Sequence, residues 1–450
     1  MNPLLLDVPA KDWNLPPGET YREKQIRDWV LKRFVSSYDE MTDLSASLRS
    51  NLASRFRLRA AEPLKIQGSE DTTRKFLWKL GDGSMVESVL IPATLGSSGN
   101  RSTRLTLCVS SQVGCAYGCR FCASGIDGWR RNLTPGEIVG QVIEAAKIAG
   151  RRPDNLVFMG MGEPLANLPN LLQALDLLIS PSGIGMGARH ITISTSGLAP
   201  QIEELAHHPL QFRLALSLHA ASDEIRDKIM PVNKRYPLDR LLGACDTFVR
   251  TKNKQIFFEY ILLAGVNDDP TQARLLAQHA RRLNAKVNLI PYNKVEGLPY
   301  ERPSETTIRL FCQTLLKGGI RATVRREKGH DIDAACGQLR LKELHLKPKP
   351  SGLSQSPTCH STRSELRFCL TRSWRNWQTH YLEVVAGQPM EVQILSSATK
   401  RARVFPVPEA ISDWARGRFT GVKSSRAQRN RPAWTPAASL RPTSAPSVGL

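Results

Sequence analysis

The sequence predicts an α/β fold built on a parallel sheet that is either open or rolled into a barrel. From about residue 104 onward, short apolar or β-branched runs alternate with amphipathic helical stretches, the spacing of repeated strand–helix units. Polar and glycine-rich residues follow these runs: GMGEP after the second, STSG after the third, SLHA after the fourth and PYN after the sixth. Function in such folds collects at the carboxyl ends of the strands, so we expect the site there.

The chain ahead of this repeat predicts two smaller parts. Residues 1–60 are expected to form an N-terminal helical accessory domain, because GETYREKQIRDWVLKRF places apolar residues at helical spacing and a second helix follows a cap at Thr42 or Ser45. Its Lys and Arg residues make it a candidate RNA-contacting domain. Residues 61–103 are expected to form a β-hairpin extension, with the turn at GDG, residues 81–83.

The repeat itself, residues 104–345, is expected to be the catalytic part of the chain, and residues 346–450 break its pattern. The tail is Pro/Ser-rich at its end and shows no useful periodicity, which favours disorder. Its middle looks like the translation of a transfer-RNA gene. We therefore interpret residues 346–450 as a low-complexity tail that is disordered or is read-through sequence, and assign it no function.

Net charge points weakly to a polyanionic partner. The 450 residues carry a formal charge of +21, but the tail alone holds 16 Lys and Arg against 5 Asp and Glu. The remaining chain is only moderately basic, so nucleic-acid binding is not inferred from the total charge.

Composition also indicates which cellular compartment to expect. No stretch approaches the ~20 apolar residues of a membrane helix, and the opening MNPLLLDVPAKDW lacks the features of a secretory signal. The nine cysteines are odd in number and include a tight cluster. This usage favours metal or redox chemistry in a reducing compartment, so we expect a cytoplasmic protein.

The cluster that carries the chemistry is CVSSQVGCAYGCRFCASG, residues 108–125. Cys115, Cys119 and Cys122 form C-x3-C-x2-C directly after a predicted strand. Three thiolates on one loop suit an iron–sulfur cluster, since iron prefers soft sulfur ligands. Zinc is the alternative, but a structural zinc site takes four ligands and no second pair follows at suitable spacing. Three ligands to a four-iron cube leave one iron open to a substrate.

Cys336 is an isolated thiol in GHDIDAACGQL, residues 329–339. A lone cysteine after two alanines is most often a small core residue. Its own neighbours therefore give it no chemical role.

Taken together, VSSQVGCAYGCRFC, GMGEP, STSG, SLHA, PYN and DIDAACGQL resemble the RlmN/Cfr family of radical S-adenosylmethionine (SAM) RNA adenine methyltransferases. The resemblance runs from about residue 18 to residue 345. It implies a partial (βα)6 radical-SAM barrel with a small N-terminal helical domain.

The resemblance also implies two cofactors and the residues that hold them. Cys115, Cys119 and Cys122 would hold a [4Fe–4S] cluster whose open iron is chelated by SAM, with two SAM molecules consumed per turnover. The residues expected to bind SAM lie at the strand ends: Gly162, Glu163, Ser194, Ser217, Leu218, His219 and Asn293. Taken alone, His219 and Asn293 have the simpler readings of a core histidine and a turn residue.

The resemblance implies that Cys336 is a methyl carrier. Carbon 2 or 8 of adenine is not nucleophilic, so it cannot take the methyl group from SAM by ordinary attack. Glu87 in MVESVLIP matches the proton acceptor for the ring proton, a sensible task for a carboxylate. Cys108 matches the resolving thiol that releases the product by forming a transient disulfide with Cys336.

The substrates implied are an adenine in the peptidyl-transferase region of 23S rRNA and an adenine beside the anticodon of tRNA. An electron donor such as flavodoxin or ferredoxin is expected, with no membrane partner and a monomeric protein. We expect methylation at carbon 2. Two alternatives stay open: C8 methylation by the Cfr branch, and a non-catalytic iron–sulfur RNA-binding protein.

Overall fold

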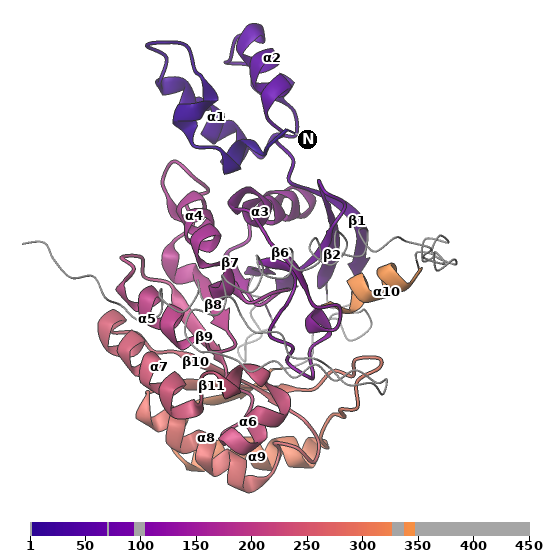
Figure 1. Cartoon of the computed structure of the whole chain (residues 1–450), viewed down its shortest axis with the longest axis vertical. Helices are drawn as coiled ribbons and strands as arrows, with labels where there is room; N and C mark the ends of the chain where they lie inside the picture. The colour runs from indigo at the N-terminus through magenta and orange to yellow at the C-terminus, as the bar shows by residue number, and fades with distance from the viewer. Residues whose placement is uncertain (1, 70–71, 94–103, 326–336, 347–450) are drawn as a thin grey trace, which may run out of the picture. The chain divides into compact units, whose positions relative to one another are not determined.

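The computed structural model describes residues 2–69, 72–93, 104–325 and 337–346. All of them belong to one compact unit, Met1–Ser354, whose central element is a ten-stranded sheet (Figure 1). Its strands in spatial order are β1 (Ala61–Gly68), β2 (Arg74–Leu80), β3 (Met85–Pro92), β4 (Leu105–Cys108), β7 (Asn155–Phe158), β8 (Ile191–Thr195), β9 (Arg213–Ser217), β10 (Phe257–Leu262), β11 (Lys286–Pro291) and β12 (Ala322–Val324).

In this sheet β4 and β7 to β12 run parallel, and this part is the predicted barrel. The six apolar runs of the sequence are β4 and β7 to β11. Within the described residues β1 and β12 pair with one neighbour each and not with each other, so the sheet stays open. A partial barrel with a helical domain ahead of it is therefore confirmed, with β12 as an additional strand.

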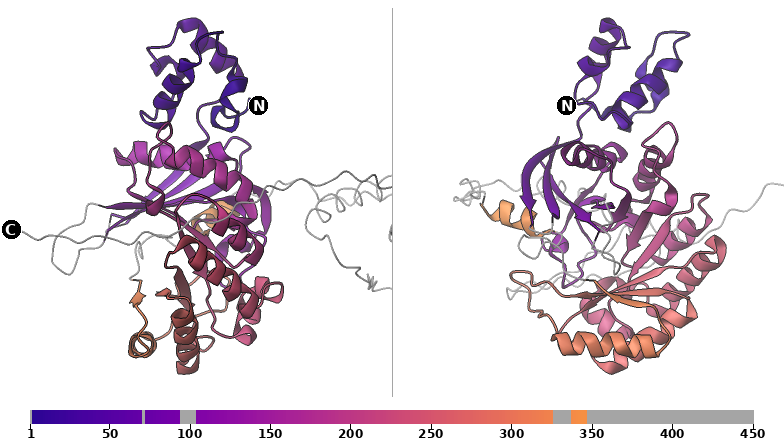
Figure 2. Two further views of the ribbon diagram at one scale, coloured as in Figure 1. Left: turned by 90° about the vertical axis from the view of Figure 1, so that its left-hand side faces the viewer. Right: turned by 180° about the vertical axis from the view of Figure 1, so that it is seen from behind.

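Helices cover the outer side of the parallel strands, while their inner side faces the cavity described below (Figures 1 and 2). These helices are α3 (Pro135–Ala149), α4 (Leu168–Ile179), α5 (Ala199–His207), α6 (Asp223–Ile229), α7 (Leu238–Lys252), α8 (Pro270–Arg282) and α9 (Glu305–Lys317). In the part of the chain that the structure describes, no helix is long and apolar enough to cross a membrane.

The N-terminal part contains α1 (Tyr21–Leu31) and α2 (Ala46–Arg55). Ser45 is the cap of α2, where its hydroxyl accepts the Leu48 N–H, so of the two predicted caps Ser45 is the right one. Each helix buries one apolar side, as amphipathic helices do; the buried side chains are Ile26, Val30, Leu31, Leu48 and Leu52. This part is tied to the barrel at Asp7, whose carboxylate accepts the backbone N–H of Gly136 at 2.6 Å.

Ahead of the barrel, β1, β2 and β3 form an antiparallel extension on the β4 edge of the sheet. The expected hairpin is β2 paired with β3, and it turns at Gly81–Gly83. Residues of β2 and β3 are buried on both faces over most of their length, because a final short helix, α10 (Gln338–Leu346), packs against β3.

Candidate active site

The three clustered cysteines lie on a loop that is closed by its own small sheet. This sheet pairs β5 (Gln112–Gly114) with β6 (Trp129–Asn132). Gly114 has φ of +79°, and a Cβ there would lie 1.9 Å from the carbonyl oxygen of Gly128. Only glycine allows this close approach, so the sequence VGC is what lets the loop close.

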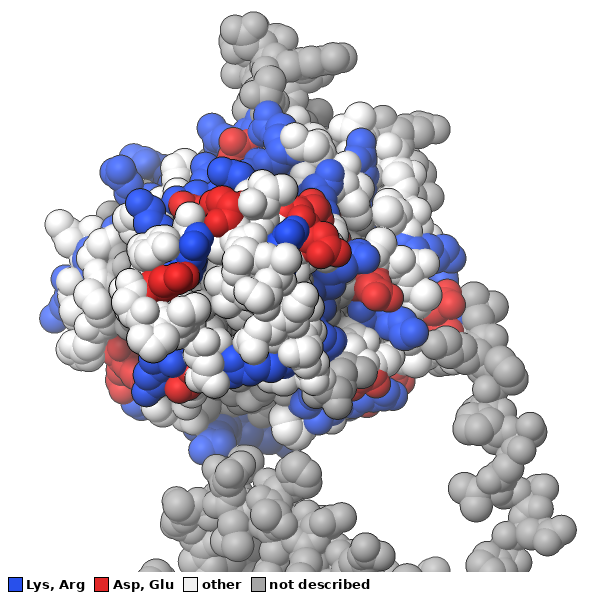
Figure 3. All heavy atoms as spheres, turned by 90° about the horizontal axis from the view of Figure 1, so that it is seen from above, with Lys and Arg blue, Asp and Glu red and all other residues white. Residues whose placement is uncertain are grey.

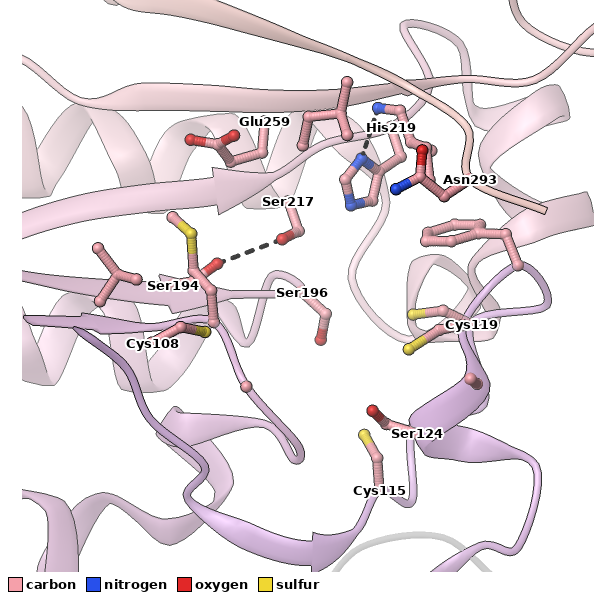
Figure 4. Close-up of a pocket in the computed structure, with 18 of the residues that line it drawn as sticks. Cys108, Cys115, Cys119, Ser124, Ser194, Ser196, Ser217, His219, Glu259 and Asn293 are labelled. Carbon is pink, nitrogen blue, oxygen red and sulfur yellow. Dashed lines mark hydrogen bonds between the residues drawn. The ribbon is translucent and has the colours of Figure 1, made fainter. Parts of the chain in front are cut away.

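One cavity of about 350 Å³ opens at the carboxyl ends of the parallel strands. Most of the residues predicted from the sequence line it (Figure 4). They are Cys108, Cys115, Cys119, Cys122, Gly162, Glu163, Ser194, Ser217, His219 and Asn293. Figure 4 shows Cys108 on one side of this cavity and Cys115 and Cys119 on the other.

Two predicted residues do not line the cavity, and a third is not described by the structure. Leu218 is fully buried in the core beside it. Glu87 is 1% exposed and lies on β3, outside the cavity wall. Cys336 lies outside the described residues.

The GMGEP turn after β7 is shaped by a close backbone approach. Gly162 has φ of +97°, and a Cβ there would lie 2.5 Å from the Cβ of Gln112. The amide oxygen of Gln112 accepts the Glu163 N–H at 2.8 Å, and its nitrogen donates to Asn132. Gln112 therefore holds the turn and the cysteine loop in one arrangement.

Glu163 joins two strand ends with its carboxylate. One oxygen accepts the Ser196 N–H at 2.6 Å and the other accepts the Leu165 N–H at 3.1 Å. Burial raises the pKa of this carboxyl, while the hydrogen bonds oppose that rise. The side chain lines the cavity, so a ligand ammonium group can approach the same carboxylate.

His219 presents one defined ring nitrogen as a donor. Its Nδ1 accepts the Ile261 N–H at 3.0 Å, so the proton of the neutral ring is on Nε2. Burial, and secondarily the nearby Arg226 guanidinium, lower the pKa of His219 to about 3. The neutral ring packs edge-on against Phe121 in the cysteine loop, with ring centroids 4.9 Å apart.

A row of four polar residues crosses the inner face of the barrel, and only Ser217 among them was predicted from the sequence. Ser217, Glu259, Asn288 and Thr323 stand in register on neighbouring strands. Asn288 donates to the Glu259 carboxylate at 2.8 Å and accepts from the Thr323 hydroxyl at 2.7 Å. A single Glu within the apolar run FFEYIL was the signal for this row, because a buried carboxylate needs polar neighbours.

The cysteine loop fits an iron–sulfur cube better than a single ion. Among the described residues, no group of three or more His, Cys, Asp or Glu is close enough to hold one metal ion. A [4Fe–4S] cube spreads its three thiolate ligands over three irons, and so accepts a wider spacing. Burial raises the pKa of the Cys115 thiol to about 12 and that of Cys119 well above its ordinary value; iron would supply the positive charge that buried thiolates need.

Comparison with known proteins agrees with this geometry. Residues 109–275 match the radical SAM superfamily, and residues 17–58 match the ribosomal RNA large subunit methyltransferase N-terminal domain. A probable dual-specificity RNA methyltransferase RlmN of Akkermansia muciniphila is 55% identical over 327 residues, which are 73% of this chain and 91% of the relative. The chain belongs to the RlmN family.

Two further relatives support this membership. The dual-specificity RNA methyltransferase RlmN of Anaeromyxobacter dehalogenans is 47% identical, over 71% of this chain and 86% of its own length. A crystal structure of a radical SAM methyltransferase from Sphaerobacter thermophilus is 41% identical, with a TM-score of 0.69 over 75% of this chain and 98% of that one. The chain is therefore a radical SAM RNA methyltransferase.

Proposed function

We propose that this chain methylates carbon 2 of an adenine in the peptidyl-transferase region of 23S rRNA, and an adenine beside the anticodon of tRNA. The observation that carries the proposal is the single cavity that gathers three clustered cysteines, the strand-end motifs and Cys108. Dual-specificity RNA methyltransferases are the named relatives. Ribosomes and tRNA place the reaction in the cytoplasm, with flavodoxin or ferredoxin as the expected electron donor.

Cys115, Cys119 and Cys122 would hold the cluster, and the strand ends opposite them would hold SAM. When bound, these groups supply the reducing electron and the radical that activate a methyl group. Ser124 supports a ligand here: its hydroxyl is buried, lines the cavity and finds no hydrogen-bond partner among the described residues. A polar ligand would satisfy it.

Cys336 is the proposed methyl carrier. Its sulfur displaces S-adenosylhomocysteine from one SAM, so that an S–CH3 bond forms, the sulfonium bond breaks and the thiol proton leaves. Gly337, the next residue, lies against Ser124 in the cavity wall, where a Cβ on Gly337 would come within 3.0 Å of the Ser124 hydroxyl. This contact supports delivery of the neighbouring thiol to the cavity.

Cys108 is the proposed resolving thiol. It ends β4, is buried and lines the same cavity. After the carbon carried by Cys336 has bonded to the adenine ring, the Cys108 thiolate attacks the Cys336 sulfur. The S–S bond forms, the S–C bond breaks, and the electron pair left on carbon takes up a proton to complete the methyl group. No disulfide joins two of the described cysteines, and the pairing with Cys336 stays a prediction.

Glu87 is retained as the proposed acceptor of the ring proton. It lies on β3, which pairs with β4, the strand that carries Cys108. Its carboxylate is engaged by other groups in this structure, as described in the next subsection.

The helical domain is proposed to contact RNA through individual Lys and Arg side chains. A general attraction is not expected, because the total charge of this domain is nearly balanced. Residues 1–60 hold ten Lys and Arg against eight Asp and Glu. Figure 3 looks onto this end of the molecule and shows Lys and Arg spread over it, with Asp and Glu between them. Phosphate contacts would position RNA here without reading its sequence.

The proposed function is tested by mass spectrometry of nucleosides from 23S rRNA and tRNA of cells that lack their own enzyme and express this chain. We expect 2-methyladenosine in both RNAs, lost in Cys336→Ala and kept in Cys312→Ala, a matched change on α9. Finding 8-methyladenosine alone would establish the C8 alternative. Full activity in Cys336→Ala would contradict the methyl-carrier role and favour a different class of protein.

A further inference from the structure

Glu87 makes a set of contacts that a proton acceptor does not require. Its carboxylate and the Lys75 ammonium form an ion pair of 2.9 Å, with 1% and 0% of their side chains exposed. One carboxylate oxygen also accepts the Gly337 N–H at 2.7 Å, and the other accepts the Arg340 N–H at 2.6 Å. A side chain of the N-terminal half thus binds backbone about 250 positions later.

The Lys75 ammonium, the Glu87 carboxylate and the two backbone N–H groups satisfy one another's charges and hydrogen bonds. A buried ion pair is costly unless further hydrogen bonds satisfy the carboxylate, and the two backbone N–H groups do so. The first turn of a helix has N–H groups without partners inside the helix, and α10 begins at Gln338, directly after Gly337. Charge-assisted bonds of this kind are the stronger ones, so the start of α10 is firmly attached to the β2–β3 hairpin.

The opposite side of the same turn contacts the cysteine loop. Gly337 has φ of +88°, and a Cβ there would lie 2.8 Å from the Ser124 nitrogen. The Arg340 guanidinium, 1% exposed, pairs with Asp127 at 3.3 Å. Ser124 and Asp127 follow Cys122 in the chain. The start of α10 is therefore held between the hairpin and the loop that carries the clustered cysteines.

We propose that Lys75 and Glu87 form a positioning clamp, which fixes the chain that leaves Cys336 against the cysteine loop so that its thiol meets SAM. The inference rests on the proposed function, because it takes Cys336 as the methyl carrier. Lys75 acts through Glu87: its ammonium group holds the carboxylate in place at 2.9 Å. The clamp is a second duty of Glu87, distinct from proton acceptance.

Positioning of the thiol and acceptance of the ring proton can be told apart in the first half-reaction, the methylation of Cys336. Transfer of a methyl group from SAM to Cys336 releases S-adenosylhomocysteine and a thiol proton, and involves no adenine ring. A residue that only accepts the ring proton is not needed for it. A clamp that presents the thiol is needed.

The test measures S-methylation of Cys336 by mass spectrometry of its peptide, using the full chain with its reconstituted cluster and SAM and no RNA. We expect Lys75→Met to methylate Cys336 at least about tenfold more slowly than wild type, the loss typical of a charge-assisted bond. SAM affinity should stay unchanged, since neither Lys75 nor Glu87 lines the cavity. Lys79→Met is the matched control, an exposed lysine on the same strand.

A second variant covers the case in which Lys75→Met fails to fold. Glu87→Asp keeps both charges and a carboxylate base, but is one methylene too short to reach both N–H groups. We expect it to slow S-methylation and to speed hydrogen exchange of the amides of Gly337 and Arg340 in the protein without SAM. Wild-type rates of S-methylation in Glu87→Asp would overturn the clamp. Absence of S-methyl-Cys336 from wild type would instead overturn the proposed function.

Discussion

His219 combines an unusual backbone with a fixed ring. Its φ is 59°, a left-handed conformation that non-glycine residues adopt at a cost of order 1–3 kcal/mol and mostly at functional sites. The Asn267 amide stabilises it by donating to the His219 carbonyl at 2.7 Å. The residue therefore presents a neutral Nε2–H donor to the cavity, where a ligand acceptor such as an adenine nitrogen would fit.

The pKa of about 3 for His219 gives a direct prediction. Between pH 6.5 and 3 the unfolded chain binds a proton here that the folded chain does not, so this histidine lowers stability as the pH falls through 6.5. NMR of ring-labelled histidine should show the Nε2–H tautomer of His219 unchanged from pH 8 to pH 5. His219→Asn, which tolerates positive φ, assigns the signal; a midpoint near 6.5 would contradict the buried, neutral ring.

Gly162→Ala should abolish the shape of the GMGEP turn. The backbone at position 162 keeps a positive φ, which alanine disfavours, and the new Cβ collides with Gln112. We therefore expect SAM affinity to fall by at least about tenfold, the effect of ~1.4 kcal/mol. Gly185→Ala is the control, since it has φ of +73° with nothing within 4 Å of its Cβ. Calorimetric titration with SAM checks both, and equal affinities would contradict the role of the turn.

Single residues differed in how far the sequence revealed them. His219 and Asn293 were predictable because they follow strands, and parallel strands end at one edge. Gln112 and Lys75 were not, because their importance depends on partners fixed only by tertiary structure. Glu87 was predicted from the family resemblance, while its bonds to Gly337 and Arg340 depend on the packing of α10.

At the scale of elements, α3 shows how local sequence and packing agree. Thr134 and Glu137 form a reciprocal capping box, Pro135 occupies the first turn, and Gly150 ends the helix with φ of 69°. Most of the helix is buried. Its amide side chain Gln141 accepts from Ser88 and from the Ser110 N–H, which ties the helix to the strands beside the cysteine loop.

Thr134→Ala removes one half of this capping box. We expect the free energy of unfolding to fall by about 1 kcal/mol, measured from urea denaturation. Thr251→Ala, an exposed position in α7, should change it by less than ~0.5 kcal/mol. Equal effects of the two substitutions would show that the cap contributes nothing specific.

Strands that lie in an apolar run were predictable, and strands without one were not. The strands β4 and β7 have only four residues each, but apolar runs in the sequence mark them. The strands β5, β6 and β12 have three or four residues each and lie in no such run, so they show no period. Their pairing is decided by neighbours in the fold, as with Gly114 against Gly128.

At the scale of the whole molecule, the match to relatives stops well short of this chain's length. The Akkermansia muciniphila relative is covered over 91% of its own length by 327 residues, whereas this chain has 450. The chain separates into units of Met1–Ser354 and Gln355–Leu450. The first unit contains every described residue of the site.

A chain that ends at Ser354 should therefore unfold at the same thermal midpoint as the full chain. Its rate of RNA methylation should stay within about twofold of that of the full chain. A chain that ends at Cys336 is the matched comparison. It lacks α10 and its bonds to Glu87, and should lose methylation. Loss of activity on truncation at Ser354 would show that the second unit contributes to the reaction.

The central claim is that carbon passes to RNA through Cys336 and that Cys108 releases it. The most direct measurement is mass spectrometry of the Cys336 peptide from Cys108→Ala protein after reaction with SAM, reductant and RNA. We expect an adenine nucleotide joined to the Cys336 sulfur through one carbon, absent from wild type. An unmodified Cys336 together with normal yields of methylated RNA would contradict it.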